Sequence, residues 1–89
     1  MDKDKYDQQS LDLLKRAFEY ANPDKKDSWE KLDLEAPIET LGIQSITALE
    51  MAGFIEDELN HEFPDREIAK INTLKNLLDL ISATRTAKA

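Results

Sequence analysis

The sequence predicts an all-α protein, a four-helix bundle with a short third helix and a long loop between helices one and two. Apolar residues recur every three or four positions in three segments, which is the spacing of one helix face. No segment shows the strict alternation of a half-buried strand, and no internal repeat is present. A chain of 89 residues is one small domain, which we expect to cover 1–89 with frayed ends at 1–6 and 84–89.

The first helix is expected to begin near Asp7 and to end at Asn22-Pro23. Proline lacks an amide donor and disfavours helix in the residue before it. The predicted core face of this helix consists of apolar side chains, namely Leu11, Leu13, Leu14, Ala17, Phe18 and Ala21. We interpret the helix as scaffold.

The connection over 22–43 is long for a compact domain, so part of it should be ordered. We expect Asp27-Ser28 to cap a short turn that holds Trp29 and Leu32. Three apolar residues are expected to fix the remainder on the bundle: Leu34, Ile38 and Leu41. We interpret Trp29 as an aromatic plug beneath the loop, and a contact with a partner or ligand is the alternative.

The second helix is predicted from Ser45 to Leu59 or Asn60, with two distinct faces. Its apolar stripe consists of Ala48, Met51, Ala52, Ile55 and Leu59. Its opposite stripe, at i, i+4, i+7 and i+11, consists of Ile46, Glu50, Gly53 and Asp57. Glycine inside a helix costs about 1 kcal/mol relative to alanine, so Gly53 suggests the close approach of a neighbour or partner.

Two further helices are predicted after Pro64. We expect Asp65 to cap a short third helix in which Ile68 and Ile71 face inward. Thr73 is expected to cap the last helix. The core positions of that helix are Leu74, Leu77, Leu78 and Ile81, spaced at i, i+3, i+4 and i+7.

The net charge of −7 is concentrated on the second helix and the loop that follows it. Residues 44–67 hold seven acids and one base, a net of −6, whereas 68–89 hold one acid and four bases, a net of +3. Such a field repels nucleic acids and anionic lipids and attracts basic protein surfaces. We therefore expect protein partners, and neither nucleic acid nor a membrane.

The rest of the composition favours a cytoplasmic monomer. The chain has no cysteine, hence no disulfide and no thiolate ligand for zinc. Its first residues lack the apolar segment of a signal peptide, and no apolar run is long enough to span a membrane. The acidic N-terminus lacks the glycine and glutamate positions of a calcium-binding loop, so we predict no metal site.

Ser45 follows a Leu41-Gly42 turn at the start of the second helix. A catalytic serine needs a base within hydrogen-bond reach, and the only histidine, His61, lies about one helix length away. A Gly-x-Ser-x-Gly elbow is also absent. We therefore predict that the chain is not an enzyme. From the residues alone, Ser45 is either a helix N-cap or a modification site.

At this point the sequence resembles the acyl carrier proteins. Their Leu-Gly turn and Ser-Leu or Ser-Ile entry into an acidic helix are matched by Leu41, Gly42, Ser45, Ile46 and Glu50. The resemblance continues through Glu56-Asp57-Glu58-Leu59, Phe63-Pro64-Asp65 and Ile71-Asn72-Thr73-Leu74, about half the chain. One position departs, because Gln44 stands where the family most often has aspartate.

The resemblance implies that Ser45 carries 4′-phosphopantetheine, taken from coenzyme A, whose thiol holds acyl groups as thioesters. It implies as partners a phosphopantetheinyl transferase and acyl-loading, condensing and tailoring enzymes with basic docking surfaces. The expected docking residues are Gln44, Ile46, Glu50, Gly53, Glu56 and Asp57. A cleft for the acyl chain between the second and third helices is expected to be lined by Met51, Ile55, Phe63 and Ile68, although these residues are equally compatible with plain core.

Gly-Ile-x-Ser-Ile at 42–46 looks more like polyketide carriers than fatty-acid ones, so a polyketide or fatty-acid-like pathway is expected. Gln44 removes a carboxylate beside the serine and puts recognition by a generic fatty-acid transferase in doubt. Two alternatives remain open: a peptidyl or aminoacyl carrier, and an unmodified helical module for protein interactions. Ser45→Ala separates the last of these from a carrier.

Overall fold

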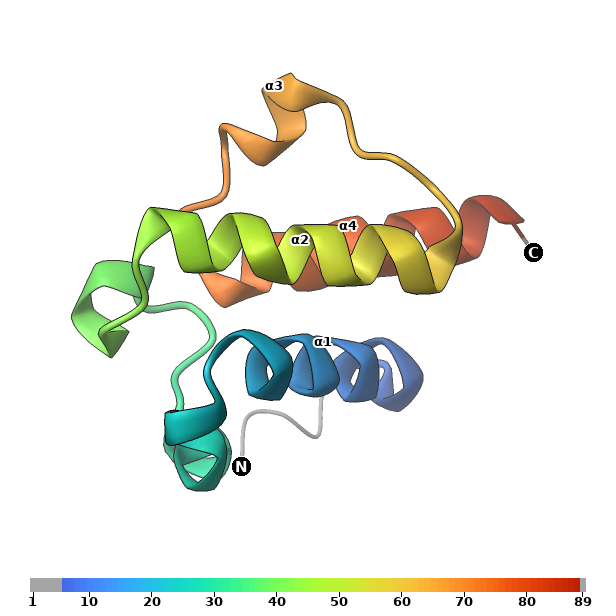
Figure 1. The fold of residues 1–89 in the computed structure, drawn as a ribbon. Helices are drawn as coiled ribbons and strands as arrows, with labels where there is room; N and C mark the ends of the chain where they lie inside the picture. Colours follow the sequence, from blue (N-terminus) through green and yellow to red (C-terminus); the bar gives the residue numbers. More distant parts are fainter. Residues whose placement is uncertain (1–5, 89) are drawn as a thin grey trace.

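The computed structural model describes residues 6–88, which form helices and connecting loops without a strand (Figure 1). In chain order the elements are α1 (Gln8–Ala21), η2 (Pro23–Lys31), η3 (Ile38–Leu41), α2 (Ser45–Leu59), α3 (Asp65–Ile68) and α4 (Leu74–Lys88), where η denotes a 3-10 helix. In Figure 1, α2 crosses the centre with α4 behind it and α1 beneath it, and the short α3 lies above. The predicted all-α bundle with a short third helix is confirmed.

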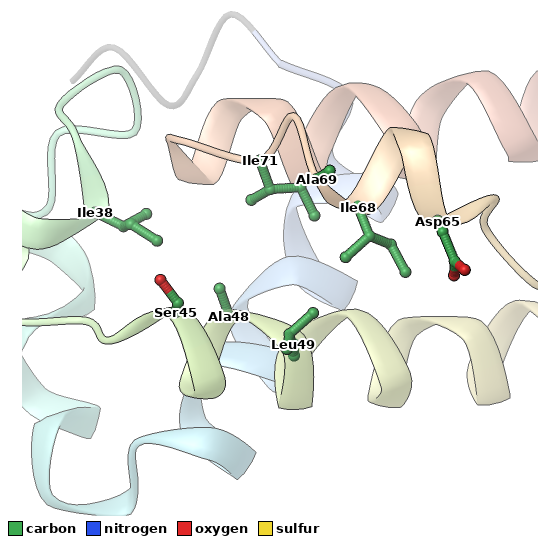
Figure 2. A pocket seen from close by; sticks show the side chains of 8 residues that line it. All are labelled: Ile38, Ser45, Ala48, Leu49, Asp65, Ile68, Ala69 and Ile71. Atoms are coloured by element: carbon green, nitrogen blue, oxygen red, sulfur yellow. The ribbon is translucent and has the colours of Figure 1, made fainter.

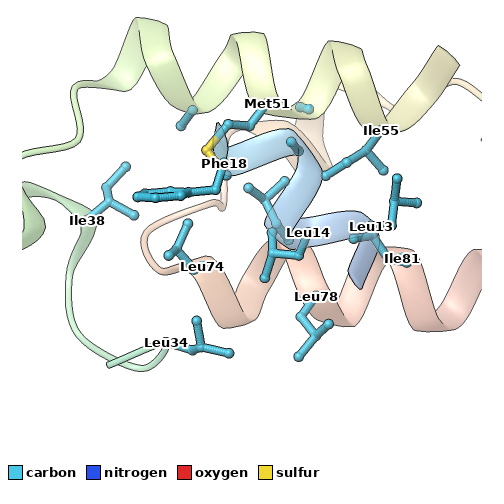
Figure 3. Close-up of a cluster of buried hydrophobic side chains, with 14 of the residues drawn as sticks. Leu13, Leu14, Phe18, Leu34, Ile38, Met51, Ile55, Leu74, Leu78 and Ile81 are labelled. Carbon is cyan, nitrogen blue, oxygen red and sulfur yellow. The ribbon is translucent and has the colours of Figure 1, made fainter. Parts of the chain in front are cut away.

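The core lies between α1, α2 and α4 (Figure 3). Each helix contributes the apolar stripe that its spacing predicted, and the residues with no exposed surface include Leu14, Phe18, Met51, Ile55, Leu77 and Ile81. Burying one such side chain contributes about 1.5–3 kcal/mol, so these stripes supply most of the favourable free energy of folding.

The start of α1 is capped and tied to the end of α4. Asp7 Oδ2 accepts hydrogen bonds from Ser10 N at 3.1 Å and from Ser10 Oγ at 2.7 Å. The same carboxylate pairs with Arg85, which also donates to Ser10 Oγ at 2.8 Å. These two hydrogen bonds from Ser10, and then the Arg85 guanidinium, hold the pKa of Asp7 below its usual value.

The fraying predicted at 84–89 stays a prediction, and the described part of this segment is helical. α4 continues to Lys88, and Thr84 is only 8% exposed. Arg85 of this segment contacts Asp7 at the start of α1, and the two residues are 78 positions apart in the sequence. Of the fraying predicted at 1–6, residues 1–5 lie outside the described part, whereas Tyr6 packs against the core.

The long connection between α1 and α2 is largely ordered. η2 begins at Pro23, so the predicted Asp27-Ser28 cap is wrong, and Ser28 Oγ donates to Lys25 O at 2.7 Å. Trp29 is 3% exposed with its ring 5.6 Å from that of Phe18, which confirms the aromatic plug. The apolar residues expected to hold the loop are buried, Leu34 and Ile38, or partly buried, Leu32 and Leu41.

The remaining helix ends differ in how they are capped. Thr73 caps α4 as predicted, because its Oγ1 accepts a hydrogen bond from Asn76 N at 3.1 Å. Asp65 does not cap α3: it is the first helical residue, preceded by Pro64, and no side chain caps this helix. Asn60 ends α2 in the left-handed conformation, φ 52°.

Within 6–88, no helix has the length and apolarity that crossing a membrane requires.

Candidate functional site

A tight turn places Ser45 at the first position of α2. Gly42 ends η3 with φ +77°, a conformation that costs little only for glycine. The next residue, Ile43, is 2% exposed, and its amide donates to Ile38 O at 3.0 Å. Ile43 thus fixes the turn in the core and leaves Gln44 and Ser45 exposed. The burial of Ile43 was not predicted from the sequence. The signal for it is an apolar residue between a turn glycine and the start of a helix.

The N-cap of α2 is Gln44, and no side chain caps the helix. The interpretation of Ser45 as the N-cap is therefore wrong, and among the described residues its hydroxyl has no hydrogen-bond partner. The first amides of a helix lack partners within it and carry about half a positive charge in sum. Ser45 consequently combines an exposed, unused hydroxyl with a local environment that favours an anion.

An apolar pocket of about 450 Å³ opens beside Ser45 (Figure 2). Its walls come from η3, α2, α3 and the loop after α3, through Ile38, Ala48, Leu49, Ile68, Ala69 and Ile71. Figure 2 shows the Ser45 oxygen at one end and the Asp65 carboxylate at the other, with Ile68 and Leu49 pointing toward each other between them. The pocket can take up an apolar chain that is attached at Ser45.

Three of the four predicted cleft residues do not line this pocket. Met51 and Ile55 have no exposed surface and Phe63 is 5% exposed, so all three belong to the core. Met51 and Ile55 lie on the side of α2 that packs against α1 and α4 (Figure 3). Ile68 does line the pocket, together with Leu49, whose side chain is 52% exposed.

The predicted docking residues are mainly on the surface. Ile46 is 65% exposed, and Gln44, Glu50 and Asp57 are exposed as well. Gly53 and Glu56 are half-buried. Glu56 is also structural, because its Oε2 accepts a hydrogen bond from Phe63 N at 2.6 Å and so holds the loop after α2. An exposed isoleucine beside exposed carboxylates offers both apolar and charged contacts to another protein.

Catalysis by Ser45 finds no support in the geometry. His61 lies beyond the C-terminal end of α2, whose 15 residues extend for about 22 Å. Among the described residues, no group of three His, Cys, Asp or Glu side chains is placed to hold a metal ion. The arrangement at Ser45 suits a covalent attachment rather than a nucleophile activated by a base.

The comparisons with known proteins identify the family of the chain. A family described as "Phosphopantetheine attachment site" matches residues 26–81, which is more than half of the chain. The chain therefore belongs to the phosphopantetheine-binding carriers, the family of the acyl carrier proteins. Its members bear 4′-phosphopantetheine and are carriers rather than catalysts, served by a phosphopantetheinyl transferase and pathway enzymes.

One curated relative is an "Acyl carrier protein homolog" from Ureaplasma parvum serovar 3. It is 39% identical over 51 residues, which are 57% of this chain and 62% of the relative. The chain thus matches less than two thirds of that relative's length. No solved structure matches the chain.

The residues around Ser45 fit the family's prosthetic group. The group is joined to the protein through a phosphodiester, and Ser45 offers an exposed hydroxyl at amides that favour negative charge. The adjacent pocket is mainly apolar, which suits the cargo rather than the phosphate. When bound, the group supplies the thiol that this cysteine-free chain lacks.

Proposed function

We propose that Ser45 is the attachment residue for 4′-phosphopantetheine and that the protein shuttles acyl thioesters between enzymes of a polyketide or fatty-acid-like pathway. The proposal rests chiefly on the position of Ser45, whose exposed hydroxyl lies at the start of α2 and at the mouth of an apolar pocket. Four serines are present in the chain. Ser10 is fully buried and Ser28 donates to a backbone carbonyl, so neither offers this combination.

Different groups around Ser45 would support different tasks of a carrier. The free amides at the start of α2 favour the phosphodiester by about 0.3–1 kcal/mol, the range for a charge at an exposed helix end. Gly42 keeps side-chain bulk away from the turn. The pocket walls remove apolar cargo from water, and each methylene that is buried contributes about 0.8 kcal/mol. Attachment also raises the effective concentration of the cargo at a docked enzyme.

Docking is proposed to use exposed residues at the start of α2 and along it, with Ile46 as the apolar contact and Gln44, Glu50 and Asp57 as polar contacts. Exposed ion pairs contribute only about 0.2–1 kcal/mol each. Such an interface forms and dissociates quickly and weakens as salt rises. A carrier that must leave each enzyme after one step needs this fast dissociation. We further propose that the carrier works as a monomer in the cytoplasm.

The test is the intact mass of the protein after incubation with coenzyme A and a promiscuous phosphopantetheinyl transferase. We expect the parent to gain the mass of one phosphopantetheine group and Ser45→Ala to gain nothing while keeping its helical circular dichroism. Ser82→Ala, a serine on α4, is the matched control and should be modified like the parent. Modification of Ser45→Ala would refute the assignment.

The polyketide assignment draws on the Gly-Ile-x-Ser-Ile pattern and on Gln44. A pathway-specific transferase that does not require a carboxylate before the serine would suit Gln44. The enzyme that loads the carrier decides the cargo: an acyltransferase supports this proposal, whereas an enzyme that activates an amino acid would make the protein an aminoacyl carrier.

A further inference from the structure

The pocket beside Ser45 is apolar along its walls and polar at its two ends. Of the eight side chains that line it, six are apolar, and the other two are Ser45 and Asp65. Figure 2 shows the Ser45 oxygen at one end and the Asp65 carboxylate at the opposite end, directed toward α2. A chain that is tethered at Ser45 and lies along this pocket would therefore meet a carboxylate at its far end.

The position of Asp65 is fixed by the two residues before it. Phe63 is 5% exposed, and its amide donates to Glu56 Oε2 at 2.6 Å, which anchors the loop after α2 on that helix. Pro64 follows with φ −59°, and its carbonyl accepts a hydrogen bond from the Ile68 amide at 3.2 Å. The turn that places Ile68 in the pocket wall thus also places Asp65 at the end of the pocket.

Within the described part of the chain, the fold makes no use of the Asp65 carboxylate. Asp65 does not cap α3, and no hydrogen bond or ion pair between described residues involves its side chain. Glu67 on the same helix, by contrast, pairs with Lys70 at 3.9 Å. The helix dipole offers Asp65 little, because α3 has only four residues. The acceptor oxygens of Asp65 are therefore available to a ligand in the pocket.

A carboxylate at the end of the pocket changes which cargo is held best. A wholly apolar pocket favours a plain alkyl chain, because a hydroxyl group that leaves water without a new hydrogen bond is penalised. An ionised carboxyl group accepts hydrogen bonds and donates none. It therefore favours a chain that ends in a donor, and no basic side chain lines the pocket to favour an anionic end instead. The two kinds of pocket rank the same chains in opposite order.

We propose that the protein carries an acyl group whose distal end bears a hydrogen-bond donor, a hydroxyl or an amino group, and that Asp65 binds this donor. The inference rests on the proposed carrier function and names the class of its cargo. The apolar walls hold the hydrocarbon part of the chain, and Asp65 selects the donor at its end.

The proposed cargo also defines the reactions that supply it. The enzymes that build the chain must leave or introduce a hydroxyl or amino group on it. Enzymes that reduce every oxygen-bearing carbon to a methylene would instead deliver the plain alkyl chain that this pocket holds less well.

The test compares acyl groups of one length with different ends on the full-length protein: octanoyl, ω-hydroxyoctanoyl and ω-aminooctanoyl. Each is transferred with its phosphopantetheine from the acyl-coenzyme A, and only samples whose intact mass shows complete loading are used. Two readouts follow, namely the rate of thioester hydrolysis relative to the same acyl-coenzyme A in solution, and nuclear Overhauser contacts from the chain to Ile68 and Leu49.

We expect both donor-ended chains to show these contacts and to be hydrolysed about two- to fivefold more slowly than octanoyl. This factor is the lower part of the range for one net hydrogen bond, because Asp65 is exposed. Hydrolysis of the donor-ended chains at the octanoyl rate or faster, or the absence of contacts with Ile68 and Leu49, would overturn the proposal.

Two substitutions at Asp65 separate its charge from its acceptor oxygens. Asp65→Leu makes the end of the pocket apolar and should reverse the order, so that octanoyl is protected best. Asp65→Asn keeps an acceptor but removes the charge, so it should keep the preference for the hydroxyl group and reduce that for the amino group. Glu67→Leu removes a carboxylate of α3 that does not line this pocket and is the matched control, which should keep the order of the parent.

The variants are compared only after circular dichroism shows that they are folded. An unchanged order in Asp65→Leu, an undiminished preference for the amino group in Asp65→Asn, or a reversed order in Glu67→Leu would each contradict the assignment. If Asp65→Leu does not fold, Asp65→Asn decides. A parent protein that gains no mass at Ser45 would contradict the carrier function itself, so the two failures are distinguishable.

Discussion

Truncating Met51 and Leu49 separately tests the distinction between the core and the pocket beside Ser45. Met51 has no exposed surface, and Met51→Ala should cost about 2–5 kcal/mol, the range for removing a large buried side chain. Leu49 is 52% exposed. Since full burial of leucine is worth about 1.5–3 kcal/mol, half-burial limits the cost of Leu49→Ala to about 1 kcal/mol, and the higher helix propensity of alanine offsets part of it.

Urea unfolding followed by far-UV circular dichroism measures both costs. A small domain loses about 1–3 kcal/mol of stability per molar urea, so Met51→Ala should lower the midpoint by about 0.7–5 M and Leu49→Ala by no more than about 1 M. On the loaded carrier, Leu49→Ala should have a larger effect than Met51→Ala on the lifetime of the bound thioester. Leu49→Ala opens a pocket wall and should speed hydrolysis of an apolar acyl thioester, measured by mass spectrometry. Equal midpoints for the two variants would refute the placement of Met51 in the core and of Leu49 in the pocket.

Three further predictions concern the turn, the helix ends and transferase recognition. Gly42→Ala should lower the free energy of unfolding by about 1–2 kcal/mol in urea, the cost of a left-handed conformation for a residue with a Cβ; an unchanged midpoint would argue against φ +77° there. Asp7→Asn keeps a capping side chain but removes the carboxylate charge, whose pKa is lowered by hydrogen bonds from Ser10 and by Arg85. A lowered folded-state pKa stabilises the protein above the usual value of 3.8 and stops doing so as pH falls through the lowered value. The melting-temperature difference from the parent should therefore persist at neutral pH and vanish in acid, and a difference that does not depend on pH would exclude the charge as its cause. Gln44→Asp should speed modification by a generic transferase in the mass assay, and no change in rate would show that this position does not determine recognition.

Local sequence patterns determined most of the fold. Apolar residues that recur every 3.6 positions lie on one face of a helix, so helix geometry alone predicts which face is buried. The predicted faces of α1, α2 and α4 do pack in the core. Pro23, Thr73 and the Leu41-Gly42 turn mark helix boundaries through short-range backbone chemistry. The same local turn placed Ser45 at the start of α2, which is why the candidate attachment residue was visible from the sequence.

The tertiary structure alone decided which apolar residues are core and which line a pocket. Met51 and Leu49 are two positions apart on one helix, and only the placement of α1, α3 and α4 around it buries the first and leaves the second half-exposed. Arg85, near the end of α4, pairs with Asp7 at the other end of the chain. The pairing of Tyr20 with Phe54 likewise joins separate helices. Periodicity reports the face of one helix, whereas these features depend on which faces of different helices meet.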